Sequence, residues 1–309
     1  MNSPASRIRP VRVVACSVRP LGERSTHPIF RLDVQLDSGE ELPLVLKQLR
    51  PRPGRDTRRE ALVYRRLLGH RRFGAPLLYA AWCDDARHRS WLVLEHVGSQ
   101  RLDQRGTSGW ERTVRHVARM HAVYDARAAE LAGLGCLDHH DARYYRSLAM
   151  QARATLRRRA EPGARTRFDE LVRRWFPPVV DLLDRQPRTL VHGGLTAHNV
   201  VLQPGGVVRL VDWETAGNGA AAVDLAKLLE GWGPAKPRLV TAYADEFARH
   251  ASRTLDAGFD RALRAAGTLR ILRFLHWWKE PCDDADFVDR QLTRLERAWR
   301  ELAEGVCRG

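Results

Sequence analysis

Two polar side chains, Asn199 and Asp212, flank a predicted β-hairpin. Residues 200–202 and 207–211 are short apolar segments, and Pro204-Gly205-Gly206 between them is typical of a turn. Asn199 precedes the first strand and Asp212 follows the second, so the hairpin brings both to one edge. An amide oxygen and a carboxylate are suitable ligands for a hard cation bound to phosphate oxygens.

The segment before this hairpin, His-Gly-Gly-Leu-Thr-Ala-His-Asn at residues 192–199, carries a family resemblance. It resembles the catalytic loop of the aminoglycoside phosphotransferase and choline kinase family, which usually runs His-Gly-Asp-Leu-His-Pro-Gly-Asn. The positions that match in register are His192, Gly193, Leu195, Asn199, Asp212 and Trp213. Gly194 stands where the family has the aspartate that accepts a proton from the substrate hydroxyl, and residues 196–198 also depart.

The resemblance implies an ATP-dependent phosphotransferase in which Asn199 and Asp212 bind Mg²⁺. A general base typically contributes roughly 10²–10⁴-fold to the rate, so Gly194 predicts a severe loss of activity without forbidding turnover. His198 and Glu214 are candidate substitutes for the missing base. The alternatives are a solvent-facing histidine in the loop and a glutamate paired with one of the many arginines.

Lys47 is one of only four lysines in the chain. It ends the alternating segment 42–47, which follows a second alternating segment at 30–36 and a turn at Asp37-Ser38-Gly39. The two segments predict an antiparallel hairpin. In the resembled family a lysine on such an inner strand holds the α- and β-phosphates of the nucleotide. An exposed strand lysine is the alternative.

Glu60 lies in a predicted helix at residues 57–68. Thr57 and Glu60 have the spacing of a capping box, which would use the carboxylate locally. The resembled kinases place a glutamate here to pair with the strand lysine. We favour the ion pair between Lys47 and Glu60.

Strands are also expected at residues 78–83 and 91–95, and the segment after them resembles the hinge of a kinase. Its backbone, around Glu95 and Val97, would contact the adenine. No glycine-rich phosphate loop is evident. Ser25 and Thr26, between the first two strands, could contribute hydroxyls or backbone amides, and neither is assigned to that role.

Beyond the hinge the pattern is helical. Helices are expected at 143–159, 165–176, 222–230, 239–251, 259–278 and 286–302, and one opens at a capping box of Ser108 and Glu111. We expect His121 on its apolar stripe to be a core residue. Asp224 matches a family aspartate that braces the catalytic loop or caps the helix that follows, and we expect a structural role for it. For Trp277 and Trp278 we expect core packing.

These elements predict an α+β, bilobal protein-kinase-like fold. Residues 1–97 would form a small antiparallel-sheet lobe with one helix, which binds nucleotide. Residues 98–309 would form a larger, mostly helical lobe that carries the catalytic and metal loops.

Charge and cysteine content narrow the function classes. The net charge is +15 and clusters at residues 50–72 and 153–174, which indicates solvated helix faces or an anionic partner such as an acidic peptide. It argues against a polycationic aminoglycoside. Five scattered cysteines, without a signal peptide or spanning segment, predict a cytoplasmic protein with no membrane association.

Three functions from different classes remain. The first, which we favour, is a kinase that acts on a hydroxyl of a small molecule or of a Ser/Thr peptide. The second is a pseudokinase that binds nucleotide and positions a partner. The third is a polyanion-binding protein on a retired kinase scaffold.

Overall fold

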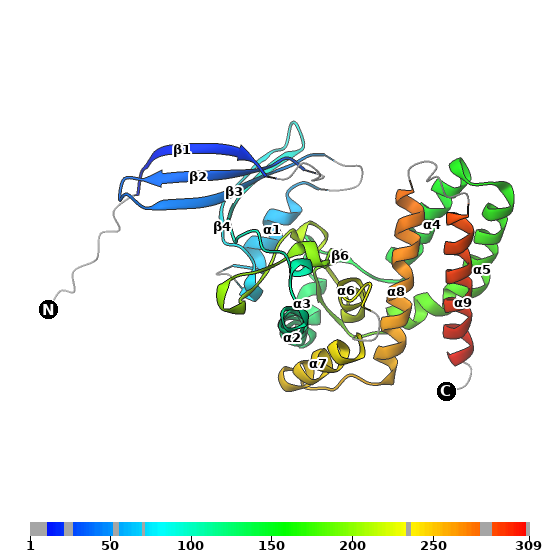
Figure 1. The fold of residues 1–309 in the computed structure, drawn as a ribbon. Helices are drawn as coiled ribbons and strands as arrows, with labels where there is room; N and C mark the ends of the chain where they lie inside the picture. Colours follow the sequence, from blue (N-terminus) through cyan, green and yellow to red (C-terminus); the bar gives the residue numbers. More distant parts are fainter. Residues whose placement is uncertain are drawn as a thin grey trace. The chain divides into compact units, whose positions relative to one another are not determined.

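The fold is described from a computed structural model over residues 11–21, 27–51, 56–69, 72–232, 236–278 and 286–306. By its contacts the chain forms two units. The first runs to Ser99 and includes Arg209–Val211, and the second comprises Gln100–Val208 and the chain from Asp212 onward. The result is a mixed α+β structure with an antiparallel-sheet lobe and a larger helical lobe, as predicted (Figure 1).

The first unit contains a five-stranded antiparallel sheet in the order β1-β2-β3-β5-β4 (Figure 1). Its strands are β1 (Val13–Pro20), β2 (Ile29–Leu36), β3 (Glu41–Leu49), β4 (Leu78–Asp84) and β5 (Arg89–Glu95). The helix α1 (Arg59–Arg66) follows β3, and a 3₁₀ turn at Arg72–Gly74 precedes β4. The two predicted hairpins are therefore confirmed, and β3 lies in the middle of the sheet.

The second unit is built mainly from helices. They are α2 (Thr107–Asp125), α3 (Ala128–Ala132), α4 (Ala142–Arg159), α5 (Pro162–Asp184), α6 (Ala221–Leu228), α7 (Lys236–His250), α8 (Ala257–Trp277) and α9 (Phe287–Val306). In the sequence α4 and α8 are far apart, yet they pack together, and so do α5 and α9 (Figure 1). The predicted stripe of α2, from Trp110 to Tyr124, is buried.

Two small sheets and several 3₁₀ turns carry the loops of interest in the second unit. The strand order β6-β10-β7 joins Asp138–His139, Gly217–Ala220 and Arg188–Val191. The hairpin of β8 (Val200–Leu202) and β9 (Val208–Leu210) separates Asn199 from Asp212, as predicted. The 3₁₀ turns are η2 (Leu102–Gln104), η3 (Ala197–Asn199), η4 (Pro204–Gly206) and η5 (Trp213–Thr215).

Neither capping-box pattern forms: the one at Thr57 and Glu60 was the alternative to the favoured ion pair, and the one predicted at Ser108 and Glu111 is wrong. Helix α1 begins after Arg58 and α2 after Gly106, and neither residue makes a side-chain cap. Neither N-terminal residue is the one that the box required, and in both helices the glutamate is engaged by a basic side chain. Glu60 pairs with Lys47 at 2.8 Å, and Glu111 pairs with Arg115 at 2.8 Å.

Two further expectations about the helices fail. Helix α5 continues through Pro177 and Pro178, where the prediction stopped it at residue 176. Proline normally ends a helix, but the residues after it, from Val179 to Leu183, include apolar side chains packed in the core. In α8 the side chain of Trp277 is 63% exposed, so the expected core packing is wrong for this residue.

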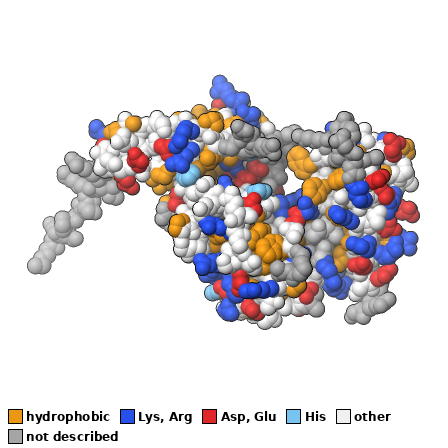
Figure 2. All heavy atoms as spheres, viewed as in Figure 1, with side chains coloured by type: hydrophobic (Ala, Val, Ile, Leu, Met, Phe, Trp, Pro, Cys, Tyr) orange, Lys and Arg blue, Asp and Glu red, His pale blue; other side chains and the backbone are white. Residues whose placement is uncertain are grey.

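Basic and acidic side chains are interspersed over the helices of the second unit on the face drawn in Figure 2. Arg153 pairs with Asp169 at 2.7 Å, and Arg167 pairs with Asp289 and with Glu296. Acidic neighbours therefore neutralise part of the arginine cluster at 153–174, which supports the interpretation as solvated helix faces. Within the described residues, no helix is long and apolar enough to cross a membrane.

Candidate active site

In the first unit, a buried ion pair links the middle of the sheet to its helix. Lys47 on β3 and Glu60 on α1 are both buried, and Lys47 Nζ lies 2.8 Å from Glu60 Oε2. The predicted ion pair is confirmed, and the competing role of Glu60 as a helix cap is excluded. A buried pair of this kind is costly to desolvate, so folding stability alone gives a weak reason for it.

The segment after β5 is held by contacts within the same unit. The N–H of Glu95 donates to the carbonyl of Leu77 (2.9 Å), and its carboxylate accepts from the Leu77 N–H (3.1 Å) and from Arg209. Val97 is buried. Contacts of Glu95 and Val97 with adenine remain predictions. The N–H of Glu95 already donates to the Leu77 carbonyl. Ser25 and Thr26 lie outside the described residues.

In the second unit, one buried carboxylate organises the start of the catalytic loop. Asp224 accepts from the backbone N–H of His192 (2.6 Å) and of Gly193 (2.8 Å), and His121 Nε2 lies 3.4 Å from the same carboxylate. Burial raises the pKa of Asp224, but the hydrogen bond and charge of His121, then His192, more than offset this, and the pKa lies below its ordinary value. The predicted structural role of Asp224 is confirmed, and of its two alternatives the structure shows the bracing of the loop. His121 is a core residue as expected.

The two glycines of the loop differ in whether their position would tolerate a side chain. Gly193 has φ +70°, and a Cβ there would lie 2.1 Å from the Thr215 carbonyl oxygen, so only glycine is tolerated. Gly194 has no positive φ, and the nearest obstacle to a Cβ is the Thr215 hydroxyl at 2.8 Å. The backbone at Gly194 therefore accepts a side chain if Thr215 yields.

The rest of the site contains side-chain oxygen atoms from Asn199, Asp212 and Glu214. Asn199 Nδ2 donates to the Gly194 carbonyl (2.9 Å), which fixes the amide so that its oxygen points away from that bond. One carboxylate oxygen of Asp212 lies within 4.8 Å of one of Glu214. Amide and carboxylate oxygens are ligands that Mg²⁺ prefers, so the donor types of Asn199 and Asp212 fit the ion that the sequence predicted.

His198 is placed away from the loop backbone. Its side chain is 78% exposed, and Nδ1 lies 3.1 Å from Asp103 Oδ2. The structure therefore favours the solvent-facing interpretation of His198. Of the two candidate substitutes for the base, Glu214 is the one that lies beside Asp212.

The family model described as "Phosphotransferase enzyme family" matches residues 29–262, which is more than half of the chain. The chain belongs to this family. Helix α1, the catalytic loop and the hairpin of β8 and β9 all fall inside the matched segment. A search of curated proteins finds no match to the sequence.

Solved structures of kinases and phosphotransferases share the fold of this family member. The aminoglycoside phosphotransferase APH(3'')-Id from Streptomyces rimosus, solved with ADP and streptomycin, is 21% identical, with a TM-score of 0.52 over 84% of this chain and 93% of that one. A microcompartment-associated aminopropanol kinase is 16% identical, with a TM-score of 0.66 over 94% and 93%. A choline kinase from Cryptosporidium parvum is 12% identical, with a TM-score of 0.63 over 94% and 90%.

This member of the family has two cations at its loop that the sequence prediction missed. Lys227 Nζ on α6 donates to the Gly193 carbonyl (3.2 Å), and Arg273 Nη1 on α8 lies 3.5 Å from the same oxygen. A signal was present for Lys227, because it is another of the four lysines whose rarity singled out Lys47. Arg273 has no such signal in an arginine-rich chain.

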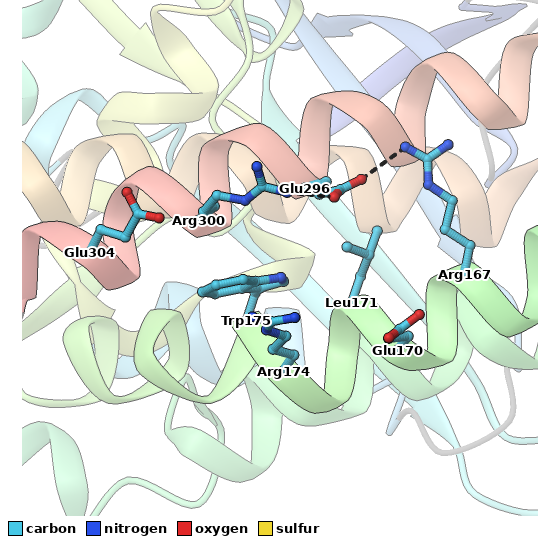
Figure 3. A pocket seen from close by; sticks show the side chains of 8 residues that line it. All are labelled: Arg167, Glu170, Leu171, Arg174, Trp175, Glu296, Arg300 and Glu304. Carbon is cyan, nitrogen blue, oxygen red and sulfur yellow. Dashed lines mark hydrogen bonds and ion pairs between the residues drawn. The ribbon is translucent and has the colours of Figure 1, made fainter.

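A pocket of about 470 Å³ lies between α5 and α9, and its lining residues belong to neither the catalytic loop nor the Lys47 pair (Figure 3). Trp175 sits in it with the guanidinium of Arg174 4.5 Å from its ring. Glu296 in the wall pairs with Arg167 and with Arg300. The mixed charge of this pocket contrasts with the cations at the loop.

Proposed function

We propose that the protein is an ATP-dependent phosphotransferase that phosphorylates a hydroxyl group of a small molecule. The observation that carries the proposal is the buried pair of Lys47 and Glu60 at 2.8 Å. Since a carboxylate fixes the lysine in the middle of the sheet, the ammonium is preorganised to bind nucleotide phosphates. Family membership and the fixed loop of the second unit support the same function.

In the proposed reaction, the acceptor oxygen forms a bond to the γ-phosphorus of ATP while the bond from that phosphorus to the bridging oxygen breaks. ADP leaves with the electron pair, and the acceptor hydroxyl loses its proton. Asn199 and Asp212 would hold Mg²⁺, which neutralises charge on the phosphate oxygens when it is bound. The transition state is loose, so positioning and neutralisation contribute more than deprotonation does.

Glu214 is the proton acceptor that we propose in place of the missing aspartate. It precedes Thr215, whose hydroxyl oxygen would lie 2.8 Å from a Cβ at position 194. His198 is the weaker candidate, because its exposed ring pairs with Asp103. Glu214→Gln should lower the rate of transfer and leave nucleotide binding intact, whereas His198→Gln should change neither.

A second candidate function is a pseudokinase that binds nucleotide without transfer. Gly194 favours it, because its backbone would accept the missing aspartate and the chain nevertheless carries none. The polyanion-binding function has less support, since several arginines of the cluster at 153–174 are already paired with acids.

The test is transfer of label from [γ-³²P]ATP with Mg²⁺ to pools of small alcohols sorted by charge. The pools are neutral polyols, hydroxy acids and amino alcohols, with an aminoglycoside and an acidic Ser/Thr peptide as separate arms. We expect label on a small alcohol, none on the aminoglycoside, and none in any pool with Lys47→Met or Asp212→Asn. Arg174→Met, in the pocket between α5 and α9, is the matched control and should behave as the unmodified protein.

Mg-ATP binding measured on the same samples separates the alternatives. Binding without label on any acceptor would contradict the enzyme and favour the pseudokinase. Absence of binding would contradict both.

A further inference from the structure

Lys227 and Arg273 form a cationic pair that shares one acceptor at the catalytic loop. Lys227 comes from α6 and Arg273 from α8, and their nitrogens lie 3.2 and 3.5 Å from the carbonyl oxygen of Gly193. Both side chains are half-buried. The next residue is Gly194, the position at which the family pattern carries its carboxylate. The carbonyl that the pair contacts is thus adjacent in sequence to that position.

Neither cation has a carboxylate partner within salt-bridge distance among the described residues of the chain. This is unusual here, because many of the arginines, such as Arg153 and Arg253, are paired with acids. Asp224 and Asp212 attract Lys227 only over a longer range, and Asp224 is already occupied by the loop N–H groups. Two like charges are thus half-buried together, with no carboxylate in contact with either among the described residues.

Arg273 is held in position by a second contact. Its Nη2 donates to the Tyr144 hydroxyl (2.8 Å), and the Tyr144 ring stacks on His140 at 4.0 Å with an angle of 9°. A Cβ at Gly193 would lie 3.4 Å from His140, so the stack lines the same loop. The guanidinium is therefore preorganised, which lowers the entropic cost of binding an anion.

The protonated state of Lys227 is energetically costly without a ligand. Burial, and then the charge of Arg273, lower the pKa of Lys227 to about 8, with partial compensation by Asp224 and Asp212. An anion placed between the two nitrogens would remove both the repulsion and part of the desolvation cost. Hydrogen bonds from a charged lysine or arginine to a carboxylate or phosphate are also stronger than hydrogen bonds between neutral groups.

We propose that Lys227 and Arg273 bind an anionic substituent, a carboxylate or a phosphate, of the small hydroxyl acceptor. The acceptor part of this inference rests on the proposed phosphotransfer function, while the anion site itself does not. With no carboxylate at position 194 to repel it, the anionic end of the acceptor is bound at the loop and its hydroxyl is presented for transfer. A half-buried pair suits a small anion better than a peptide chain.

The first test is binding in the absence of nucleotide, by titration calorimetry with D-glycerate, glycerol 3-phosphate and glycerol. The three probes share a backbone and differ in their anionic group, so the two arms with charge separate carboxylate from phosphate. We expect at least one anion to bind, and glycerol to bind more weakly by about 10–100-fold. Equal affinity for glycerol and both anions would overturn the proposal.

Variants assign the site. Lys227→Met and Arg273→Met should each weaken the bound anion by about 10–100-fold, and Lys227→Arg, which keeps the charge, should restore most of the affinity. Arg174→Met is the matched control and should not alter it. If both methionine variants fold, as shown by their thermal midpoints, and bind the anion as the unmodified protein does, the site is not here.

In the last experiment, the unmodified protein and Lys227→Met are each titrated with the anion and, separately, with Mg-ATP. Anion binding that is lost in Lys227→Met, with Mg-ATP affinity unchanged, supports an acceptor site. If Lys227→Met weakens Mg-ATP instead and no anion binds alone, the two cations serve the nucleotide phosphates, and the proposal is wrong. Absence of Mg-ATP binding with retained anion binding would contradict the phosphotransferase and leave the anion site standing.

Discussion

Two of the four lysines are half-buried or buried near functional segments, and their surroundings differ in one respect. Lys47 lies 2.8 Å from the carboxylate of Glu60, so the pair is close to neutral before any ligand arrives. Lys227 has Arg273 as its neighbour, and both donate toward the Gly193 carbonyl. One lysine is neutralised by the fold, and the other is left to be neutralised by a ligand.

The difference indicates two kinds of anion binding. Lys47 can exchange part of its interaction with Glu60 for a phosphate without an unpaired charge in either state. Lys227 and Arg273 have no such partner among the described residues, so their site gains most from an anion that arrives as part of a substrate. The nucleotide is thus assigned to the first lysine and the acceptor to the second.

Adding a carboxylate at position 194 should break this comparison most strongly. We combine Gly194→Asp with Thr215→Ala, which removes the hydroxyl that would lie 2.8 Å from the new Cβ. In this double variant we expect transfer to neutral alcohols to rise by about 10²–10⁴-fold. Binding of D-glycerate should weaken, because the new carboxylate neutralises Lys227. Rates on both acceptors measure this, with Thr215→Ala alone as the control. An unchanged rate on neutral alcohols would contradict the assignment of position 194.

Removing the lysine from each environment should have opposite effects on stability. Lys47→Met leaves the buried Glu60 carboxylate without its lysine, which should lower the free energy of unfolding by about 3–5 kcal/mol. Lys47→Met combined with Glu60→Gln should recover part of that loss. Urea unfolding measures both. If Lys47→Met is as stable as the unmodified protein, Lys47 and Glu60 do not form a buried ion pair.

The affinity for D-glycerate should depend on pH through Lys227. The groups that face this lysine are Arg273 on α8, Asp224 on α6 and Asp212 before η5, and the pKa of Lys227 is lowered to about 8. As pH rises above about 8 the ammonium loses its proton, so binding should weaken by up to about tenfold per pH unit. A bound anion moves this transition upward. Lys227→Arg should bind with little change over the same range, and a flat profile in the unmodified protein would count against the site.

The smallest effect is on the stability of the ligand-free protein. Because the folded pKa of Lys227 lies below the unfolded value of 10.5, the unfolded chain holds more protons between about pH 8 and 10.5, and stability contributed by this group rises with pH there. Below about pH 8, Lys227→Met should therefore be as stable as the unmodified protein or more so, by the order of 1 kcal/mol. A clear destabilisation would mean that Lys227 has an acidic partner.

Local patterns predicted the sheet, because the alternation along β2 and β3 is visible in the sequence. The pair of Lys47 and Glu60 was predicted from the resemblance, since the local pattern at Glu60 indicated a helix cap instead. The limits of α5 were not predictable in this way, since Pro177 and Pro178 are overridden by buried side chains further along. Lys227 and Arg273 meet through the packing of α6 against α8, which no spacing rule encodes. The loop itself was found from its motif, whereas its bracing by Asp224 required the resemblance.

The central claim is that Lys47 belongs to a working nucleotide site in a member of the phosphotransferase family. Titration calorimetry of Mg-ATP into the unmodified protein, Lys47→Met and Arg174→Met tests it directly. We expect binding that requires Mg²⁺, is lost in Lys47→Met and is unchanged in Arg174→Met. No heat of binding to the unmodified protein, or equal affinity in all three, would contradict the account.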